Sequence, residues 1–235
     1  MKRYSRSSLV GAVLVSLLGC GSDAGDEDTG GSSAALEVFP PKLYSGFDGT
    51  NAYKVPVIAH GATGKVTWKV SDESVASLTP SGTNGENVTL LTKKAGSIVL
   101  TATAGGKSST ATLTVVAYTA AQHEAGAKRY MTMPDEMNPP CVTCHGAERG
   151  ANRPNHTPTE LDADTDAEIQ KTFTSGVDPE GRRIVDMKEF SDLLTSKGYT
   201  HMWKVTDEEK IGLMAYLRSL EPIGFPEYDE PTTKK

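Results

Sequence analysis

Two cysteines and a histidine are the residues of this 235-residue chain whose types and spacing could do chemistry together. Two residues separate Cys141 from Cys144, and His145 follows at once. A C-x-x-C-H run is the pattern of covalent haem attachment, because one turn presents both sulfurs to one porphyrin edge and leaves the imidazole under the iron. The run therefore predicts one haem c, with Cys141 and Cys144 as thioether residues and His145 as the proximal axial ligand.

Three other uses of these cysteines are weighed against haem. A zinc site needs four ligands in two spaced groups, and the remaining histidines form no second pair. A redox dithiol of the thioredoxin type needs a βαβ context, which the surrounding sequence does not show. A disulfide within such a short loop would stabilise little. The sequence favours haem over these three; the histidines considered as further zinc ligands are His60, His123, His156 and His201.

The N-terminus predicts export and lipid attachment. A basic start precedes the apolar run Leu9–Leu18, which has the length of a signal-peptide core and is too short to span a bilayer. The run ends in Leu-Leu-Gly before Cys20, which resembles a bacterial lipobox. We expect residues 1–20 to be a lipoprotein signal peptide, Cys20 to be lipidated, and residues 21–35 to form a flexible acidic linker.

Residues 36–117 predict an antiparallel β-sandwich. In Val66–Val70 apolar and polar residues alternate, with Trp68 on the apolar face, and short β-branched segments alternate with glycine-rich turns. This stretch, with Ser71–Ala76 and Gly96–Ala102, resembles the group 2 bacterial Ig-like domains. The resemblance implies a spacer or an adhesive module, and we expect a spacer.

After the predicted sandwich the pattern changes to helical. Residues 118–130 are good helix formers without proline, and residues 161–174 begin acidic, as a helix N-terminus prefers. Thr206–Glu209 is a capping-box pattern before a broad apolar helix face. Pro222 is expected to stop that helix, and residues 223–235 to form a polar tail.

Residues 118–222 resemble a class I cytochrome c domain. Gly126–Tyr130 resembles the Gly-x-x-x-aromatic of the family's first helix, and Leu213–Leu220 resembles its last helix. The resemblance implies an all-α fold in which these two helices cross where the first has a small residue. Ile169–Gly181 resembles the middle helix and the loop that leads to the distal ligand. Met131–Pro140 is longer than the family's segment, and we expect it to bulge over the haem edge.

The resemblance leaves the distal iron ligand open. Met187-Lys-Glu-Phe resembles the family's Met-Pro-x-Phe, with Lys188 in place of proline, so Met187 is the first expectation. Phe190–Val205 would then be an insert. Met202 is the alternative, followed by His201, which would give a bis-histidine haem, and then an open iron. Either methionine could instead be a plain packing residue.

Together these patterns predict a multidomain protein, an all-β Ig-like sandwich followed by an all-α cytochrome c domain. The resemblance implies a membrane-anchored cytochrome that transfers single electrons to transient redox partner proteins in the bacterial cell envelope and is not an enzyme. The expected location is the outer membrane, on its periplasmic face or the cell surface. The alternatives are a peroxidase-like haem enzyme with an open distal site, and a surface adhesion protein built on the Ig-like domain. A net charge of −6 excludes a basic nucleic-acid footprint.

Overall fold

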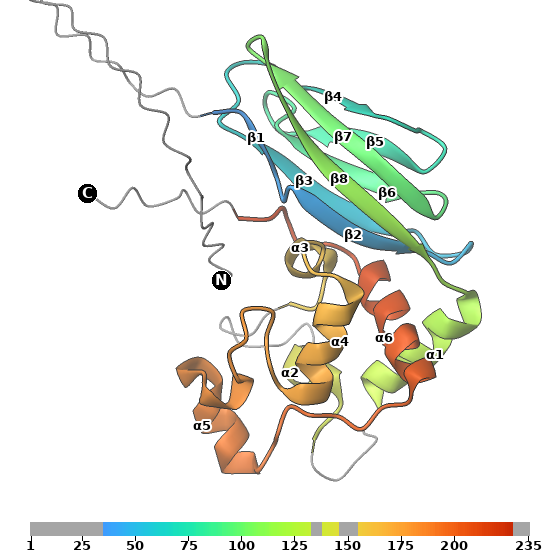
Figure 1. Cartoon of the computed structure of the whole chain (residues 1–235), viewed down its shortest axis with the longest axis vertical. Coiled ribbons are helices and arrows are strands. Elements are labelled where there is room, and N and C mark those ends of the chain that lie inside the picture. Colours follow the sequence, from blue (N-terminus) through green and yellow to red (C-terminus); the bar gives the residue numbers. More distant parts are fainter. Residues whose placement is uncertain (1–34, 133–137, 146–154, 228–235) are drawn as a thin grey trace, which may run out of the picture.

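The structure is a computed structural model that describes residues 35–132, 138–145 and 155–227 (Figure 1). The predicted signal peptide, the predicted lipidation site Cys20 and nearly all of the predicted linker lie outside the described residues. Within the described ranges, the strands lie between Glu37 and Ala117 and the α-helices between Ala120 and Ser219. No helix among these residues is long and apolar enough to cross a membrane.

Eight strands form two four-stranded sheets in the described part of the chain. The first sheet has the order β1 (Glu37–Phe39), β3 (Lys54–His60), β6 (Asn87–Thr92) and β5 (Ala76–Ser81). The second has the order β2 (Lys42–Phe47), β8 (Lys107–Ala117), β7 (Gly96–Ala104) and β4 (Thr67–Val70). Buried aliphatic side chains of both sheets belong to one hydrophobic cluster, which is the arrangement of a β-sandwich.

The predicted alternation in Val66–Val70 is confirmed. Val66, Trp68 and Val70 are buried in the core of the sandwich, while the intervening side chains are exposed. The indole N–H of Trp68 donates a hydrogen bond of 2.7 Å to the carbonyl of Gly85, which satisfies the one polar group that the ring takes into the core.

The prediction of a wholly antiparallel sandwich is wrong for one strand pair. β2 and β8 pair in parallel, from Lys42 beside Thr112 to Phe47 beside Ala117. These are the second and the last strands of the sandwich, so the rest of the sandwich provides the long connection that a parallel pair needs. The other described strand pairs are antiparallel.

The helical segment contains α1 (Ala120–Met131), α2 (Cys141–His145), α3 (Pro158–Leu161), α4 (Asp166–Ser175), the 3₁₀ helix η1 (Ile184–Asp186), α5 (Lys188–Lys197) and α6 (Asp207–Ser219). The predicted capping box of α6 is confirmed. Thr206 Oγ1 accepts a hydrogen bond of 3.2 Å from the N–H of Glu209, and Glu209 Oε2 accepts one of 2.7 Å from the N–H of Thr206.

Two helix expectations differ from the structure. The helix predicted over residues 161–174 starts later in the structure, because α3 ends at Leu161 and the capping box of Thr165 with Glu168 starts α4 at Asp166. The stretch after Met187 that was predicted as an insert contains the helix α5, which Gly198 ends in the left-handed conformation.

α1 and α6 cross at two glycines (Figure 1). A Cβ atom added to Gly126 would lie 1.8 Å from the carbonyl oxygen of Gly212. Since real Cβ atoms do not approach a carbonyl oxygen so closely, only glycine at position 126 permits this crossing. The small residue that the sequence places in the first helix therefore sets the distance between the two helices.

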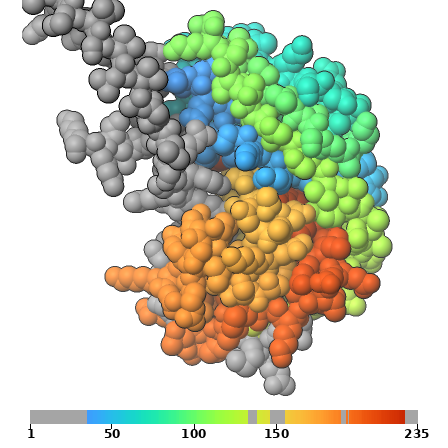
Figure 2. All heavy atoms as spheres, viewed as in Figure 1, coloured from blue at the N-terminus to red at the C-terminus, as the bar shows by residue number. Residues whose placement is uncertain are grey.

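The sandwich and the helical segment pack against each other, and Figure 2 shows their atoms meeting along a broad boundary. The N–H of Tyr44 in β2 donates a hydrogen bond of 2.7 Å to the carbonyl of Asp162. Lys54 Nζ in β3 forms an ion pair of 2.7 Å with Glu221. Side chains of both parts share one hydrophobic cluster, whose buried members are Tyr53, Tyr118, Tyr130, Ile169, Leu213, Met214, Ala215 and Leu217.

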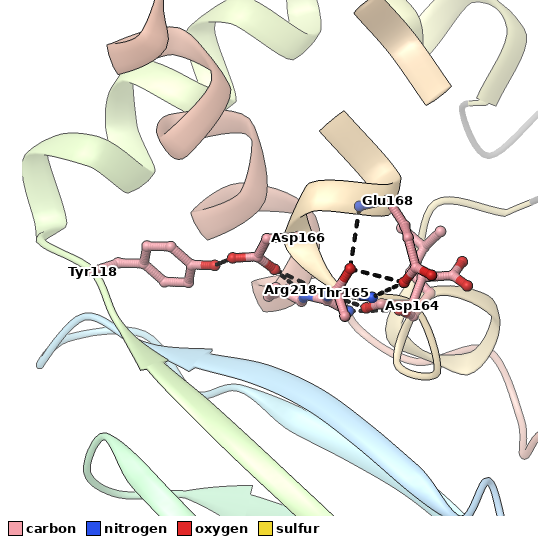
Figure 3. A network of polar contacts seen from close by, with 7 residues as sticks. Tyr118, Asp164, Thr165, Asp166, Glu168 and Arg218 are labelled. Atoms are coloured by element: carbon pink, nitrogen blue, oxygen red, sulfur yellow. Dashed lines mark hydrogen bonds and ion pairs between the residues drawn. The ribbon is translucent and has the colours of Figure 1, made fainter. Parts of the chain in front are cut away.

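A buried polar network fastens the same boundary (Figure 3). The hydroxyl of Tyr118, at the end of β8, donates a hydrogen bond to Asp166 Oδ2. The guanidinium of Arg218, which is 1 % exposed, donates to Asp166 Oδ1 at 3.0 Å and to the carbonyls of Leu161 and Asp164 at 2.5 Å. Burial, and the charge of Asp166, raise the pKa of Tyr118, so its hydroxyl keeps the proton that it donates.

Candidate functional site

Cys141, Cys144 and His145 lie on the short helix α2, which the structure builds beside the crossing of α1 and α6. Cys141 packs against the cluster around Tyr130 and Leu213. The hydroxyl of Tyr130 donates a hydrogen bond of 3.3 Å to the carbonyl of His145, so α1 holds the last residue of α2. Residues three apart lie on the same side of a helix, and α2 therefore presents both thiols in one direction.

The thiols do not have the properties of a redox dithiol. Both are partly buried, and no disulfide joins them. Burial raises the pKa of the Cys141 thiol to about 11, whereas reactive C-x-x-C thiols have a lowered pKa. The described elements next to α2 along the chain, α1 and α3, are helices, which is not the βαβ setting of thioredoxin.

A zinc site made from protein ligands alone is also not supported. Among the residues that the structure describes, no group of three or more His, Cys, Asp or Glu side chains could hold a metal ion. A structural zinc site needs four such ligands in tetrahedral geometry. The thiols and imidazole of α2 suit a different task, namely attachment to a cofactor that brings its own metal.

Three histidine rings gather at α2. The ring of His156 stacks on His145 with centroids 3.5 Å apart and planes 18° apart. The ring of His201 is nearly perpendicular to the ring of His145, with centroids 6.3 Å apart and planes 77° apart. Trp203 stands edge-to-face to His201 at 4.7 Å. His201 was the third candidate for the distal ligand, and it is the one whose ring the structure places near His145.

The contact of His156 with His145 was not predicted from the sequence. His156 was considered only as a zinc ligand, because eleven positions separate it from His145 and no motif joins the two. The ring of Tyr130 lies edge-on to His156 with centroids 6.0 Å apart. His156 therefore contacts both α1 and α2, which only the folded structure reveals.

His201 has an unusual backbone and an unusual environment. Among the described residues it is the one non-glycine residue with positive φ, at 54°. Its Nδ1 is shielded from solvent and has no hydrogen-bond partner in the described part of the chain. Burial lowers the pKa of His201 to about 4, and a hydrogen bond with the backbone at Thr172 only partly opposes this shift. The imidazole is therefore neutral at pH 7.

Asn138, three residues before Cys141, fixes the turn that carries His201. Asn138 is 1 % exposed, and its Oδ1 accepts hydrogen bonds from the N–H groups of Thr200 at 3.1 Å and His201 at 3.0 Å. Its Nδ2 donates to the carbonyl of Met202 at 2.9 Å and to the Thr200 hydroxyl at 3.1 Å. One buried amide therefore connects the segment before α2 to the turn around His201.

Trp203 reinforces this connection. Its indole N–H donates a hydrogen bond of 3.1 Å to the carbonyl of Pro139. Its backbone N–H donates one of 2.8 Å to the carbonyl of Phe173, near the end of α4. The sequence analysis expected the segment Met131–Pro140 to bulge over a haem edge. Its residues 133–137 lie outside the described ranges, while its last residues hold the turn at His201.

The two candidate methionines lie elsewhere in the helical segment. Met202 is 47 % exposed, and a Cβ on Gly176 would lie 3.3 Å from Met202 Cγ, so this side chain runs past the end of α4. Met187 is partly buried at the junction of η1 and α5, where its N–H donates a hydrogen bond of 3.1 Å to the carbonyl of Ile184. Neither position tests which residue ligates iron.

The residues present fit a covalently bound haem. Two thiols and an imidazole occupy one short helix. A second, neutral imidazole lies near the first and carries a buried nitrogen without a partner. A buried polar atom of that kind costs free energy unless a partner satisfies it, and a neutral imidazole nitrogen is a common ligand of metal ions in proteins.

Comparisons with known proteins found low structural similarity only. No protein-family model matches the chain, and no curated protein matches it. Domains 4 and 5 of the S-layer protein SbsC are similar at 19% identity and a TM-score of 0.29, covering 35% of this chain and 51% of that one. An "IG27 protein domain" is similar at 15% identity and 0.26, covering 38% and 99%. The adhesin InvE of Yersinia pseudotuberculosis is similar at 16% identity and 0.23, covering 35% and 26%.

The matched part of this chain thus spans about half of the S-layer structure. TM-scores this low do not establish a shared fold. The description of the strand region as an Ig-like β-sandwich therefore rests on the two sheets and the hydrophobic core described above.

Proposed function

We propose that this protein is a c-type cytochrome that transfers single electrons in the bacterial cell envelope, anchored to a membrane through lipid on Cys20. Cys141 and Cys144 hold one haem c through thioether bonds, and His145 is its proximal ligand. The observation that carries the proposal is the C-x-x-C-H turn of α2 with a second imidazole 6.3 Å from that of His145.

Each residue of the site has a role in this proposal. The bound haem supplies an iron that cycles between Fe(III) and Fe(II). The two cysteines fix the ring so that it cannot dissociate, and His145 holds its orientation. Tyr130, by its hydrogen bond to the His145 carbonyl, keeps α2 against α1. Buried Trp203 covers the side of His201 and keeps water away from it.

The sandwich packs against the helical segment and would keep the proposed cytochrome domain in a fixed orientation relative to it. The Tyr118–Asp166–Arg218 network and the shared apolar cluster favour a sandwich that moves together with the helical segment. The linker and the sandwich lie between the proposed lipid anchor and the haem, and would hold the haem away from the bilayer. Transient redox partner proteins could then approach the haem. The outer membrane is the proposed site of anchoring.

Covalent attachment is tested on the mature protein purified from a bacterial host with haem-maturation machinery. After extraction with acid and organic solvent, the haem should stay with the polypeptide, and the mass should exceed that of the chain by one haem. The variant Cys141→Ala/Cys144→Ala should lose the covalent haem. Pigment that washes away from the wild-type protein would refute the proposal.

The anchor and the electron transfer are tested separately. Cys20→Ala serves as the matched control, because it should keep the haem and move from the membrane fraction to the soluble fraction. Voltammetry of the holoprotein should show one reversible one-electron wave. A high-spin ferric spectrum with rapid turnover of peroxide would instead support the haem enzyme, and a mature protein without haem would support the adhesion protein.

A further inference from the structure

The distance between two imidazole rings shows which histidine leaves room for a metal ion opposite His145. A metal–nitrogen bond is about 2 Å long and the ring centre lies about 1 Å beyond the nitrogen, so two imidazoles on opposite sides of one metal ion have centroids about 6 Å apart. The rings of His145 and His201 are 6.3 Å apart. The rings of His145 and His156 are only 3.5 Å apart and stacked, which leaves no room for a metal ion between them.

The ring of His201 is prepared for a ligand on one nitrogen. Its Nδ1 is buried and has no hydrogen-bond partner among the described residues. Histidines that bind metal use one ring nitrogen for the metal. In His201 the buried Nδ1 is a nitrogen that a metal ion could satisfy.

The backbone at His201 is held in a strained conformation. A φ of 54° is uncommon for any residue with a side chain. Strain of this kind persists where surrounding contacts enforce it, and it clusters at functional sites. Here the contacts are the hydrogen bonds that Asn138 makes to Thr200, His201 and Met202. Because Asn138 lies three residues before Cys141, they couple the position of His201 to that of α2.

From these observations we propose that His201 is the distal axial ligand, so that the haem is bis-histidine ligated, and that Asn138 is a positioning residue that sets the turn. This inference rests on the proposed function, since it requires the haem. It departs from the expectation of Met187 that the sequence favours. Two imidazoles give a lower reduction potential than a histidine and a methionine, because methionine ligation raises the potential.

The neighbouring methionine does not compete well for the iron. Met202 follows His201 directly, yet its side chain is 47 % exposed and runs past Gly176. Adjacent residues of one turn cannot both direct their side chains at the same point. The turn that brings His201 to 6.3 Å from His145 therefore directs Met202 away.

The first test reads the ligand from the wild-type holoprotein. We expect electron paramagnetic resonance to show a low-spin ferric haem, and the absorption spectrum to lack the weak red band of methionine ligation. A clear red band would overturn the proposal. A wild-type protein without covalent haem is a different result: it would refute the proposed function itself.

The second test uses matched variants. His201→Gly suits the positive φ and should convert the ferric haem to high spin, and added imidazole should restore the low-spin spectrum. Met187→Leu and Met202→Leu conserve volume and should leave the spectrum unchanged. A low-spin spectrum that persists in His201→Gly, or that is lost in either leucine variant, would show that another residue binds the iron.

A third variant distinguishes positioning from ligation. Asn138→Ala keeps both imidazoles but removes the hydrogen bonds to the turn. We expect a mixture of low-spin and high-spin ferric haem, whose low-spin share rises when imidazole is added. An Asn138→Ala protein with the unchanged wild-type spectrum would remove Asn138 from the proposal and leave the assignment of His201 to the other variants.

Discussion

The side-chain oxygen of Asn138 accepts a hydrogen bond of 3.0 Å from the backbone N–H of His201, a residue 63 positions later in the chain. The same amide accepts from the N–H of Thr200 and donates to the carbonyl of Met202. Asn138 is buried, so these bonds satisfy an amide that water does not reach. The helical segment therefore depends on one polar side chain to close the turn around His201.

Replacing Asn138 should destabilise the protein even without haem. Asn138→Ala removes three hydrogen bonds to the backbone of the turn, each of which contributes about 0.5–1.5 kcal/mol. The measurement is the free energy of unfolding in urea, followed by circular dichroism. Thr143→Ala, on an exposed position of α2, is the control and should change the free energy by less than about 0.5 kcal/mol. Equal stability of the two variants would contradict this role of Asn138.

The glycine pair at the helix crossing makes a second prediction. In Gly126→Ala the new Cβ would meet the Gly212 carbonyl oxygen at 1.8 Å, so α1 and α6 must move apart. Overpacking of this kind costs about 1–3 kcal/mol or more, and here the obstacle is backbone, which cannot rotate away. Calorimetry should show a lower unfolding temperature. Ala125→Ser, at an exposed position of the same helix, should leave that temperature nearly unchanged.

The boundary between the sandwich and the helices predicts coupled unfolding. Tyr118→Phe removes the hydroxyl that donates to Asp166 and should cost about 1 kcal/mol. Tyr44→Phe is the matched control, because Tyr44 bonds Asp162 through its backbone N–H, which the substitution keeps. The wild-type protein should unfold in one calorimetric transition. Two well-separated transitions would show that the two parts unfold independently.

Arg218 should tolerate no substitution, including lysine. Its guanidinium donates to two carbonyls and to Asp166 from a position that is 1 % exposed. Lysine has no planar fork and cannot reproduce these directions, while alanine leaves Asp166 without its cationic partner. We expect a loss of about 3 kcal/mol for Arg218→Ala and a measurable loss for Arg218→Lys. Arg183→Lys, on a side chain that is 67 % exposed and makes one ion pair of 3.5 Å with the exposed Asp186, should be nearly neutral.

Asp48 predicts a dependence of stability on pH. Burial alone would raise the pKa of Asp48, but hydrogen bonds from Asn51 and from the backbone of Thr50 lower it below the ordinary value of 3.8. As the pH falls, the carboxylate of Asp48 therefore takes up a proton in the unfolded chain before it does so in the folded chain. The stabilisation from Asp48 is complete above pH 3.8 and is lost as the pH falls through the pKa of Asp48 in the folded protein.

This dependence is measured by urea unfolding at pH 7 and at pH 3. Asp48→Asn should lower the stability at pH 7 and narrow the difference between the two conditions, because the amide cannot titrate. The residues that supply the hydrogen bonds remain in place in this variant. If the stability of Asp48→Asn depended on pH as strongly as that of the wild-type protein, other carboxylates would be responsible for the pH dependence.

Local patterns in the sequence determined much of this protein. Alternation in Val66–Val70 predicted a buried strand face, and the Thr206 capping box predicted the start of α6, because both follow from short-range geometry. The spacing of Cys141, Cys144 and His145 within a single turn likewise predicts haem attachment from local geometry, and this stays a prediction.

Contacts between distant segments were decided only by the tertiary structure. The sequence ranked Met187 above His201 as the distal ligand, and it assigned no role to Asn138 or to the contact of His156 with His145. Neither the hydrogen bond between Asn138 and His201 nor the ring stacking of His156 leaves a periodic pattern, because each joins residues that folding alone brings together. The parallel pairing of β2 and β8 was hidden for the same reason, since no local signal sets which strands become neighbours across a sandwich.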